Sequence, residues 1–254
     1  MRNSEKVALV TGGARGIGQA IVSSFAAQGF TVYSLDLRDT TMEAARQAAE
    51  GRSGTVNGII GDIRDPAFIE ETCAGLESRH GAVDILVNNA GITPKKPDGK
   101  KAMMEDWSLE LWEEVQRVNV TAMFLFCKAL VPAMKEKGWG RIINMSSQAG
   151  RTKSHVASAA YSASKAAVLG FTRTMAFEIA PSGITANCIA PGRIDTPLAA
   201  VAGKEINIAY AAEIPVGRLG TPEDIAAITD FLASDRAGFL TGITIDATGG
   251  YFMI

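Results

Sequence analysis

The feature that most constrains the fold is a series of short apolar segments that lack the polar alternation of a half-exposed strand. These segments lie at residues 7–10, 31–35, 56–60, 83–87, 141–145, 184–189 and 242–245. Stretches with helical periodicity lie between them, near residues 17–28, 41–50, 66–80, 108–136, 160–180 and 222–233. Such strands are buried on both faces, as in a parallel sheet covered by helices. The sequence therefore predicts an α/β fold, a doubly wound parallel sheet of about seven strands with helices on both faces.

Two stretches, 93–107 and 193–215, do not follow this alternation of strands and helices. Long loops at the carboxyl ends of parallel strands are where such folds bind ligands. No internal repeat, low-complexity linker or break in the pattern divides the 254 residues. We therefore expect residues 1–254 to form a single domain that both binds a cofactor and carries out catalysis.

Composition excludes several classes of protein. The net charge is −2, so no overall basic field favours nucleic acid. The three cysteines are widely separated and have no histidine cluster near them, which argues against a metal site or a disulfide framework. The N-terminus lacks the apolar core of a signal peptide, and no apolar run reaches the roughly 18 residues of a membrane span. We expect a cytoplasmic protein with no metal and no membrane contact.

A glycine-rich segment follows the first predicted strand and opens the first predicted helix. It reads Thr-Gly-Gly-Ala-Arg-Gly-Ile-Gly over residues 11–18. Glycines at such a turn let the backbone approach a pyrophosphate, which the amide end of the helix then faces. The spacing differs from the general Gly-x-Gly-x-x-Gly pattern, and an ordinary turn is the alternative. Its position favours a dinucleotide site, with these contacts: Gly12, Arg15, Gly16, Ile17 and Gly18.

Asp36 follows the second predicted strand, 18 residues after Gly18. A carboxylate here, with Leu37 beside it, can bind the adenosine ribose hydroxyls and would repel a 2′-phosphate. The position therefore favours NAD over NADP. A strand-end turn is the alternative role for Asp36, and Arg15 and Arg38 are close enough in sequence to compensate a phosphate.

Tyr161 and Lys165 are four residues apart on a predicted helix, so both project from one face. A tyrosine with its ordinary pKa of about 10 is a poor base near neutrality, and an adjacent ammonium would lower that pKa. The pair predicts proton transfer by Tyr161. Alone it is a weak signal, because such pairs are common on solvated helices.

Further motifs occur in a fixed order along almost the whole chain, and with the two above they resemble the short-chain dehydrogenase/reductase family. They are Asp62, Asn88-Asn89-Ala90-Gly91, Asn119, Ser146-Ser147, Pro191-Gly192 and Thr196. The resemblance implies a Rossmann-like fold and an oxidoreductase that interconverts alcohols and ketones. It implies that Ser147 binds the substrate oxygen, Tyr161 transfers its proton, Lys165 holds the nicotinamide ribose, and Asn119 positions a relay water. Ser147 is preferred to Ser146 because Gly150 lies three residues beyond it.

The resemblance also implies further cofactor contacts. The adenine would lie at Asp62 and Ile63, and the nicotinamide half at Asn89, Pro191, Gly192, Ile194 and Thr196, together with Tyr161 and Lys165. A structural role is the alternative for some of these residues, since Asn89 could tie strand ends together and Asp62 could form a turn.

The substrate class is less constrained. Many family members of this size reduce 3-oxoacyl groups on an acidic carrier protein with NADPH, but Gly138 and Ser182 stand where two docking arginines would be. With Asp36, this favours NAD and a free polyol, sugar or hydroxy acid; the carrier-bound 3-oxoacyl substrate is the alternative. A non-catalytic dinucleotide-binding sensor or scaffold is a third possibility, which the intact Ser-Tyr-Lys set disfavours.

Residues 93–107 contain four lysines, at 95, 96, 100 and 101. They would either attract an anionic substrate or form a solvated loop, and the solvated loop is favoured. His155 lies between Ser147 and Tyr161 and could line the pocket. By resemblance we expect a homotetramer formed through the helices near 108–136 and 160–180, with the apolar C-terminus buried against a neighbouring subunit.

Overall fold

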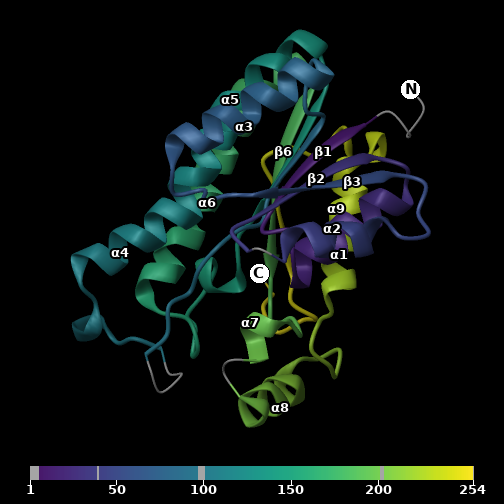
Figure 1. Cartoon of the computed structure of the whole chain (residues 1–254). Helices are drawn as coiled ribbons and strands as arrows, with labels where there is room; N and C mark the ends of the chain where they lie inside the picture. The colour runs from purple at the N-terminus through teal and green to yellow at the C-terminus, as the bar shows by residue number, and fades with distance from the viewer. Residues whose placement is uncertain (1–5, 39, 97–100, 201–202, 254) are drawn as a thin grey trace.

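The seven strands form one parallel sheet in the order β3-β2-β1-β4-β5-β6-β7 (Figure 1). The computed structural model describes residues 6–38, 40–96, 101–200 and 203–253. The strands are β1 Val7–Thr11, β2 Thr31–Asp36, β3 Thr55–Ile60, β4 Ile85–Asn88, β5 Gly140–Met145, β6 Ile184–Pro191 and β7 Thr244–Ala247. The predicted α/β fold is confirmed. The strand order reverses between β1 and β4, and a crevice is expected at such a point.

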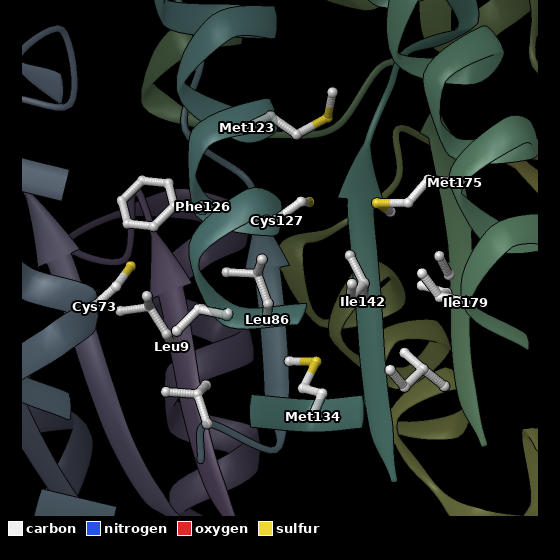
Figure 2. Packing of buried hydrophobic residues seen from close by; sticks show 14 of the residues in the cluster. Leu9, Cys73, Leu86, Met123, Phe126, Cys127, Met134, Ile142, Met175 and Ile179 are labelled. Carbon is white, nitrogen blue, oxygen red and sulfur yellow. The ribbon is translucent and has the colours of Figure 1, made fainter. Parts of the chain in front are cut away.

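Helices cover both faces of this sheet. One face carries α3 Pro66–His80, α5 Ala122–Lys137 and α6 Ala159–Ile179, and the other carries α1 Gly16–Ala27, α2 Thr41–Ala49 and α9 Pro222–Ala233. Figure 2 shows Phe126 and Met134 of α5 facing Leu9, Leu86 and Ile142 of the central strands. The three cysteines are free and buried.

Side-chain alternation explains why the central strands are apolar at successive positions. In β1, Leu9 packs with the α5 side of the sheet, while Ala8 and Val10 pack with the α1 side. The edge strands differ, because each lacks a neighbour on one side. Most of β3 is only half-buried and Ile60 is 48% exposed, so the prediction that residues 56–60 are buried on both faces is wrong.

The helix predicted near 108–136 is interrupted by a π-helical turn. α4 Leu109–Gln116 leads into this turn at Arg117–Thr121, and α5 follows without a break. The 29 residues of Leu109–Lys137 have a mean hydropathy of 1.3 and are long and apolar enough to cross a membrane by length and composition alone. Because α5 contributes its apolar face to the core against the sheet, packing accounts for this hydropathy.

The two irregular stretches follow the carboxyl ends of β4 and β6. In 93–107, the described residues 93–96 and 101–107 contain a 3₁₀ turn, Met104–Asp106, and an isolated antiparallel bridge between Lys95 and Lys101. The second stretch is not the continuous loop that we predicted, because it contains α7 Pro197–Ala200 and α8 Lys204–Glu213. No residue of α8 is buried, so the helix leaves no amphipathic pattern in the sequence.

Candidate active site

A cleft of about 470 Å³ opens at the carboxyl ends of the strands, where the strand order reverses. Sixteen of the eighteen different residues predicted for the cofactor and the chemistry line it, and only Gly18 and Asn119 do not. The sixteen are Gly12, Arg15, Gly16, Ile17, Asp36, Leu37, Asp62, Ile63, Asn89, Ser147, Tyr161, Lys165, Pro191, Gly192, Ile194 and Thr196.

The β1–α1 turn explains why glycines stand here. Gly12 has a φ of 66°, and a Cβ on it would lie 3.0 Å from the Ala90 Cα. A Cβ on Gly18 would lie 2.1 Å from the Gly12 carbonyl oxygen, so Gly18 lies behind the turn and lets α1 pack against it. The first turn of α1 carries no acidic residue, and its amide end can therefore face an anion such as a pyrophosphate.

Asn89 holds this turn against the end of β4. Its Nδ2 donates hydrogen bonds to the carbonyl oxygens of Thr11 at 3.0 Å and Gly12 at 3.1 Å. The alternative that Asn89 ties strand ends together is thus part of its role, although the residue also lines the cleft.

Asp36 ends β2 at the adenosine side of the cleft and is 5% exposed. Its carboxylate accepts hydrogen bonds from the backbone N–H of Ala14 at 3.3 Å and from the Arg38 guanidinium at 2.5 Å. Arg38 is therefore already engaged by Asp36. A dinucleotide would meet a carboxylate that is oriented and partly neutralised.

Asp62 lies in the same half of the cleft and is bound by Arg64 at 2.7 Å. The Arg64 guanidinium lowers the pKa of Asp62 and also binds Glu114 of α4 at 2.9 Å. The Asp62 carboxylate also accepts a hydrogen bond from the Arg64 backbone N–H at 2.9 Å, as a turn former does, and Arg64 is the residue that links the loop after β3 to α4.

The predicted proton-transfer residues come together deeper in the cleft. Ser147 follows β5, and Tyr161 lies in the first turn of α6, where Ser158 caps the helix. The Ser147 and Tyr161 side chains are hydrogen-bonded. Lys165 lies one turn further along α6, with its Nζ 5.7 Å from the centre of the Tyr161 ring. These contacts place a hydroxyl pair and an ammonium at one point of the cleft.

The structure also separates the two adjacent serines. The Ser146 hydroxyl donates a hydrogen bond of 2.8 Å to the backbone carbonyl of Lys165 and is buried. Ser147 instead accepts from the Ala149 backbone N–H at 3.1 Å and contacts Tyr161. The geometry agrees with the choice of Ser147.

The expectation that Lys165 lowers the pKa of Tyr161 is wrong for this structure. Burial raises the pKa of Tyr161 above its ordinary value, and the hydrogen bond from Ser147 offsets this only in part. Burial also lowers the pKa of Lys165, to about 8. Its Nζ donates to the Met145 carbonyl oxygen at 2.8 Å. A sequence shows that two groups are neighbours on a helix, but not how far both are removed from water.

Asn119 lies in the π-helical turn and does not line the main cleft. Its Nδ2 donates to the Ile92 carbonyl oxygen and to the Ser164 hydroxyl, both at 3.0 Å, and its Oδ1 accepts from the Ile92 N–H at 2.8 Å. Both side-chain donors are thus used within the protein. The side chain ties the loop after β4 to α6, beside Lys165.

The sequence did not identify several residues that line the cleft beyond the predicted cofactor contacts. Arg193 after β6 and Tyr210 of α8 line the cleft, and the Arg193 guanidinium lies 5.5 Å from the centre of the Tyr210 ring. Lys95 lines it as well, so the favoured expectation of a solvated lysine loop is wrong at this position. His155 is exposed and does not line the cleft, contrary to expectation.

The other loop lysines have different surroundings. Lys96 pairs with Asp106 at 3.1 Å, Lys101 donates to the Ser154 carbonyl oxygen at 3.2 Å, and Lys100 lies outside the described residues. Within the described ranges, no group of three or more His, Cys, Asp or Glu side chains could hold a metal ion.

Comparison with known proteins agrees with this geometry. The family described as "Enoyl-(Acyl carrier protein) reductase" matches residues 12–252. The 3-oxoacyl-[acyl-carrier-protein] reductase of Vibrio cholerae is 40% identical over 250 residues, which cover 98% of each chain.

Two solved structures have nearly the same fold. A 3-oxoacyl-[acyl-carrier protein] reductase from Brucella melitensis with bound NAD has a TM-score of 0.88 and 35% identity, covering 100% of this chain and 94% of its own. A protein assigned as an NAD(P) dependent gluconate 5-dehydrogenase, from Beutenbergia cavernae with bound NADP, has a TM-score of 0.89 and 35% identity, covering 97% and 96%. With its seven-stranded sheet and its ordered motifs, the chain belongs to the short-chain dehydrogenase/reductase family of oxidoreductases.

Proposed function

We propose that this chain transfers hydride between a nicotinamide dinucleotide and a carbon that is a ketone in one direction and a secondary alcohol in the other. The observation that carries the proposal is the hydrogen-bonded Ser147–Tyr161 pair in the cleft, with the Lys165 ammonium behind it. When bound, the dinucleotide supplies or accepts the hydride. The residues of the chain then bind and orient the substrate and the dinucleotide, and they move a proton at the substrate oxygen.

In the reducing direction, the Ser147 hydroxyl donates a hydrogen bond to the ketone oxygen, and Tyr161 donates the proton that this oxygen gains as hydride reaches the carbon. The raised pKa of Tyr161 keeps it protonated near neutrality, which is the form that reduction requires. Lys165 holds the nicotinamide ribose. Asn119 is a positioning residue, because its side chain bonds Ile92 and Ser164 rather than facing the main cleft.

The cleft fits a dinucleotide in this orientation. The pyrophosphate would lie on the glycine turn near Arg15, with the adenosine ribose at Asp36 and Leu37 and the adenine at Asp62 and Ile63. The nicotinamide half would contact Asn89, Pro191, Gly192, Ile194 and Thr196. The buried Asp36 carboxylate favours NAD over NADP, because a 2′-phosphate would bring a second negative charge to it.

Two substrate classes remain. The name of the Vibrio cholerae relative makes a 3-oxoacyl thioester the first candidate. A free small molecule of the polyol, sugar or hydroxy acid class is the second, since Gly138 and Ser182 offer no positive charge to an acidic carrier protein. The assigned activity of the Beutenbergia cavernae neighbour, on gluconate, belongs to this second class.

A spectrophotometric screen tests the function and the substrate class together. The purified chain would be assayed with NADH and NADPH on 3-oxoacyl thioesters, and with NAD and NADP on hydroxy acids, sugars and polyols. Turnover should appear with at least one compound and be lost in Tyr161→Phe. If the chain binds dinucleotide but turns over nothing in a broad screen, a non-catalytic sensor or scaffold becomes the better description.

We further propose that residues 1–254 act as one catalytic and cofactor-binding unit, as a cytoplasmic homotetramer. Apolar side chains on two helices support the assembly: Phe124 of α5 is 42% exposed and Phe177 of α6 is 83% exposed. Met253, near the C-terminus, is 78% exposed. Sedimentation at micromolar concentration should show four copies, and a monomer would contradict the assembly.

A further inference from the structure

The charges that line the cleft differ between its two halves. In the adenosine half, every lining carboxylate that the structure describes is paired with arginine. Asp36 is bound by Arg38, and Asp62 and Glu114 are bound by Arg64. This half is close to neutral once its ion pairs are counted.

Among the residues that the structure describes, the other half, which contains Ser147 and Tyr161 and is called the substrate half here, carries positive charge without a carboxylate. Lys95 donates to the Val156 carbonyl oxygen, in the segment between Ser147 and Tyr161. Arg193 donates to the Asn207 side-chain oxygen at 2.7 Å and to the Ala199 carbonyl oxygen at 2.8 Å. Among the described residues, neither cation forms an ion pair, and all of their acceptors are neutral oxygens.

Both cations are partly removed from water. Burial lowers the pKa of Lys95 and the pKa of Arg193. The positive charges of Arg193 and Lys101 lower the pKa of Lys95 further. Like charges held together in a half-buried cleft are destabilising unless an anion joins them. In the described contacts with the protein, Arg193 donates through Nε and Nη2. Its Nη1 amino group takes part in none of these hydrogen bonds and can donate to a ligand.

We propose that Lys95 and Arg193 form an anion-binding subsite that takes a free carboxylate on the substrate. The inference rests on the proposed function, because it places the carboxylate in the same cleft as Ser147 and Tyr161. It narrows the substrate to a hydroxy acid or oxo acid. A thioester of the same acid lacks this charge next to its oxo group.

A purely structural role for Lys95 makes a different prediction, and Lys101 provides the matched control. The two lysines are partners in the same antiparallel bridge, and each binds a carbonyl oxygen of the 151–157 segment. Only Lys95 lines the cleft. If the lysines merely fasten one loop to another, replacing either should have the same effect on every substrate.

The test compares acids with uncharged counterparts that share the reacting group. Acetoacetate is paired with methyl acetoacetate, and gluconate with glucitol; acetoacetyl-CoA supplies the thioester. The wild type should favour the acid in at least one pair. Lys95→Met should lower the ratio of kcat/KM for acid over neutral compound by roughly tenfold to a hundredfold, as expected for loss of a charged hydrogen bond. Lys101→Met should leave that ratio unchanged.

Arg193 needs a second pair of variants, because it also ties its loop to α8 through Asn207. Arg193→Lys keeps the charge and should retain more of the preference for acid than Arg193→Gln does. The thermal unfolding midpoints of both show whether the loop contact itself is lost. Equal acid preference in these two variants and the wild type would overturn the role of Arg193.

Calorimetry reads the subsite without turnover. Malonate, an unreactive dicarboxylate, should bind the wild type and Lys101→Met in the presence of NAD, and bind Lys95→Met at least about tenfold more weakly. Turnover of neutral compounds or thioesters without any preference for acid would overturn the anion-binding subsite while the proposed function stands. Malonate binding without turnover of any substrate would support the subsite and contradict the proposed function. A stronger preference for phosphate esters than for carboxylates would also overturn the assignment.

Discussion

The Arg38 guanidinium donates a hydrogen bond of 2.5 Å to the carboxylate of Asp36, at the end of β2. Asp36 is buried, whereas the Arg38 side chain is 41% exposed. A 2′-phosphate arriving here would have to compete with Asp36 for this arginine. The pair therefore controls the choice of cofactor through a carboxylate that repels the phosphate and an arginine that is not free to bind it.

The wild type is expected to have a higher kcat/KM with NAD(H) than with NADP(H). Two unit negative charges ~4 Å apart repel by about 4 kcal/mol at an effective dielectric constant of ~20. Asp36→Ala should weaken the binding of NAD and release Arg38 to bind a 2′-phosphate. The preference for NAD(H) over NADP(H) should then become smaller or reverse. The double variant Asp36→Ala/Arg38→Gln should lose the gain with NADP. A wild type that already prefers NADP would show that the arginines dominate this end of the cleft.

Tyr161→Phe should reduce turnover by roughly 10²–10⁴-fold, the range of general acid catalysis, because the ring remains but the transferable proton is lost. Dinucleotide affinity, measured by fluorescence titration, should be retained. Ser147→Ala should lower kcat as well, and its effect should not add fully to that of Tyr161→Phe, since the two hydroxyls bond each other. Turnover close to that of the wild type in Tyr161→Phe would rule out the mechanism.

Because of Lys165, dinucleotide affinity should depend on pH. Because burial lowers its pKa to about 8, the ammonium that holds the ribose is lost as pH rises through that value, and affinity should fall. Lys165→Met should bind weakly at every pH. The folded pKa is below the ordinary 10.5, so the unfolded chain binds more protons between these values, and this group makes stability rise with pH there. An affinity that is flat across this range would contradict the ribose role.

Gly150→Ala should disturb the site through the backbone. A Cβ on Gly150 would lie 2.6 Å from the carbonyl carbon of Lys165, so the turn after Ser147 would have to move away from α6. We expect a loss of about 1–3 kcal/mol in the free energy of unfolding, together with lower kcat. Gly75→Ala in α3 is the control, since nothing lies within 4 Å of its Cβ. It should stabilise the helix by roughly 0.5–1 kcal/mol.

The sequence predicted the sheet because its central strands are buried on both faces, and it predicted Ser147, Tyr161 and Lys165 because their motifs occur in order. Both signals are local in the chain. Lys95 and Arg193 come from distant segments without periodicity, so only the folded cleft shows that they share a half of it. The direction of the Tyr161 pKa depends on burial, which neighbouring residues in a sequence do not reveal.

The sequence did not predict the π-helical turn at Arg117–Thr121, because the apolar pattern of 108–136 continues across it. Asn119 was identified as a member of the site, yet its surroundings were not. Its two donor contacts, with Ile92 and Ser164, depend on where the turn places it between two segments that are far apart in sequence.

The same turn makes this helix unequally tolerant of changes in length. Each residue of an α-helix advances the helix by about 100° around its axis, so removal of one residue from the turn would rotate α5 relative to α4 by that angle. Val115 of α4 and Phe126 of α5, both fully buried, could not then face the interior together. Deletion scanning should therefore find that single-residue deletions within Arg117–Thr121 abolish folding, even at positions where substitution of the side chain is tolerated.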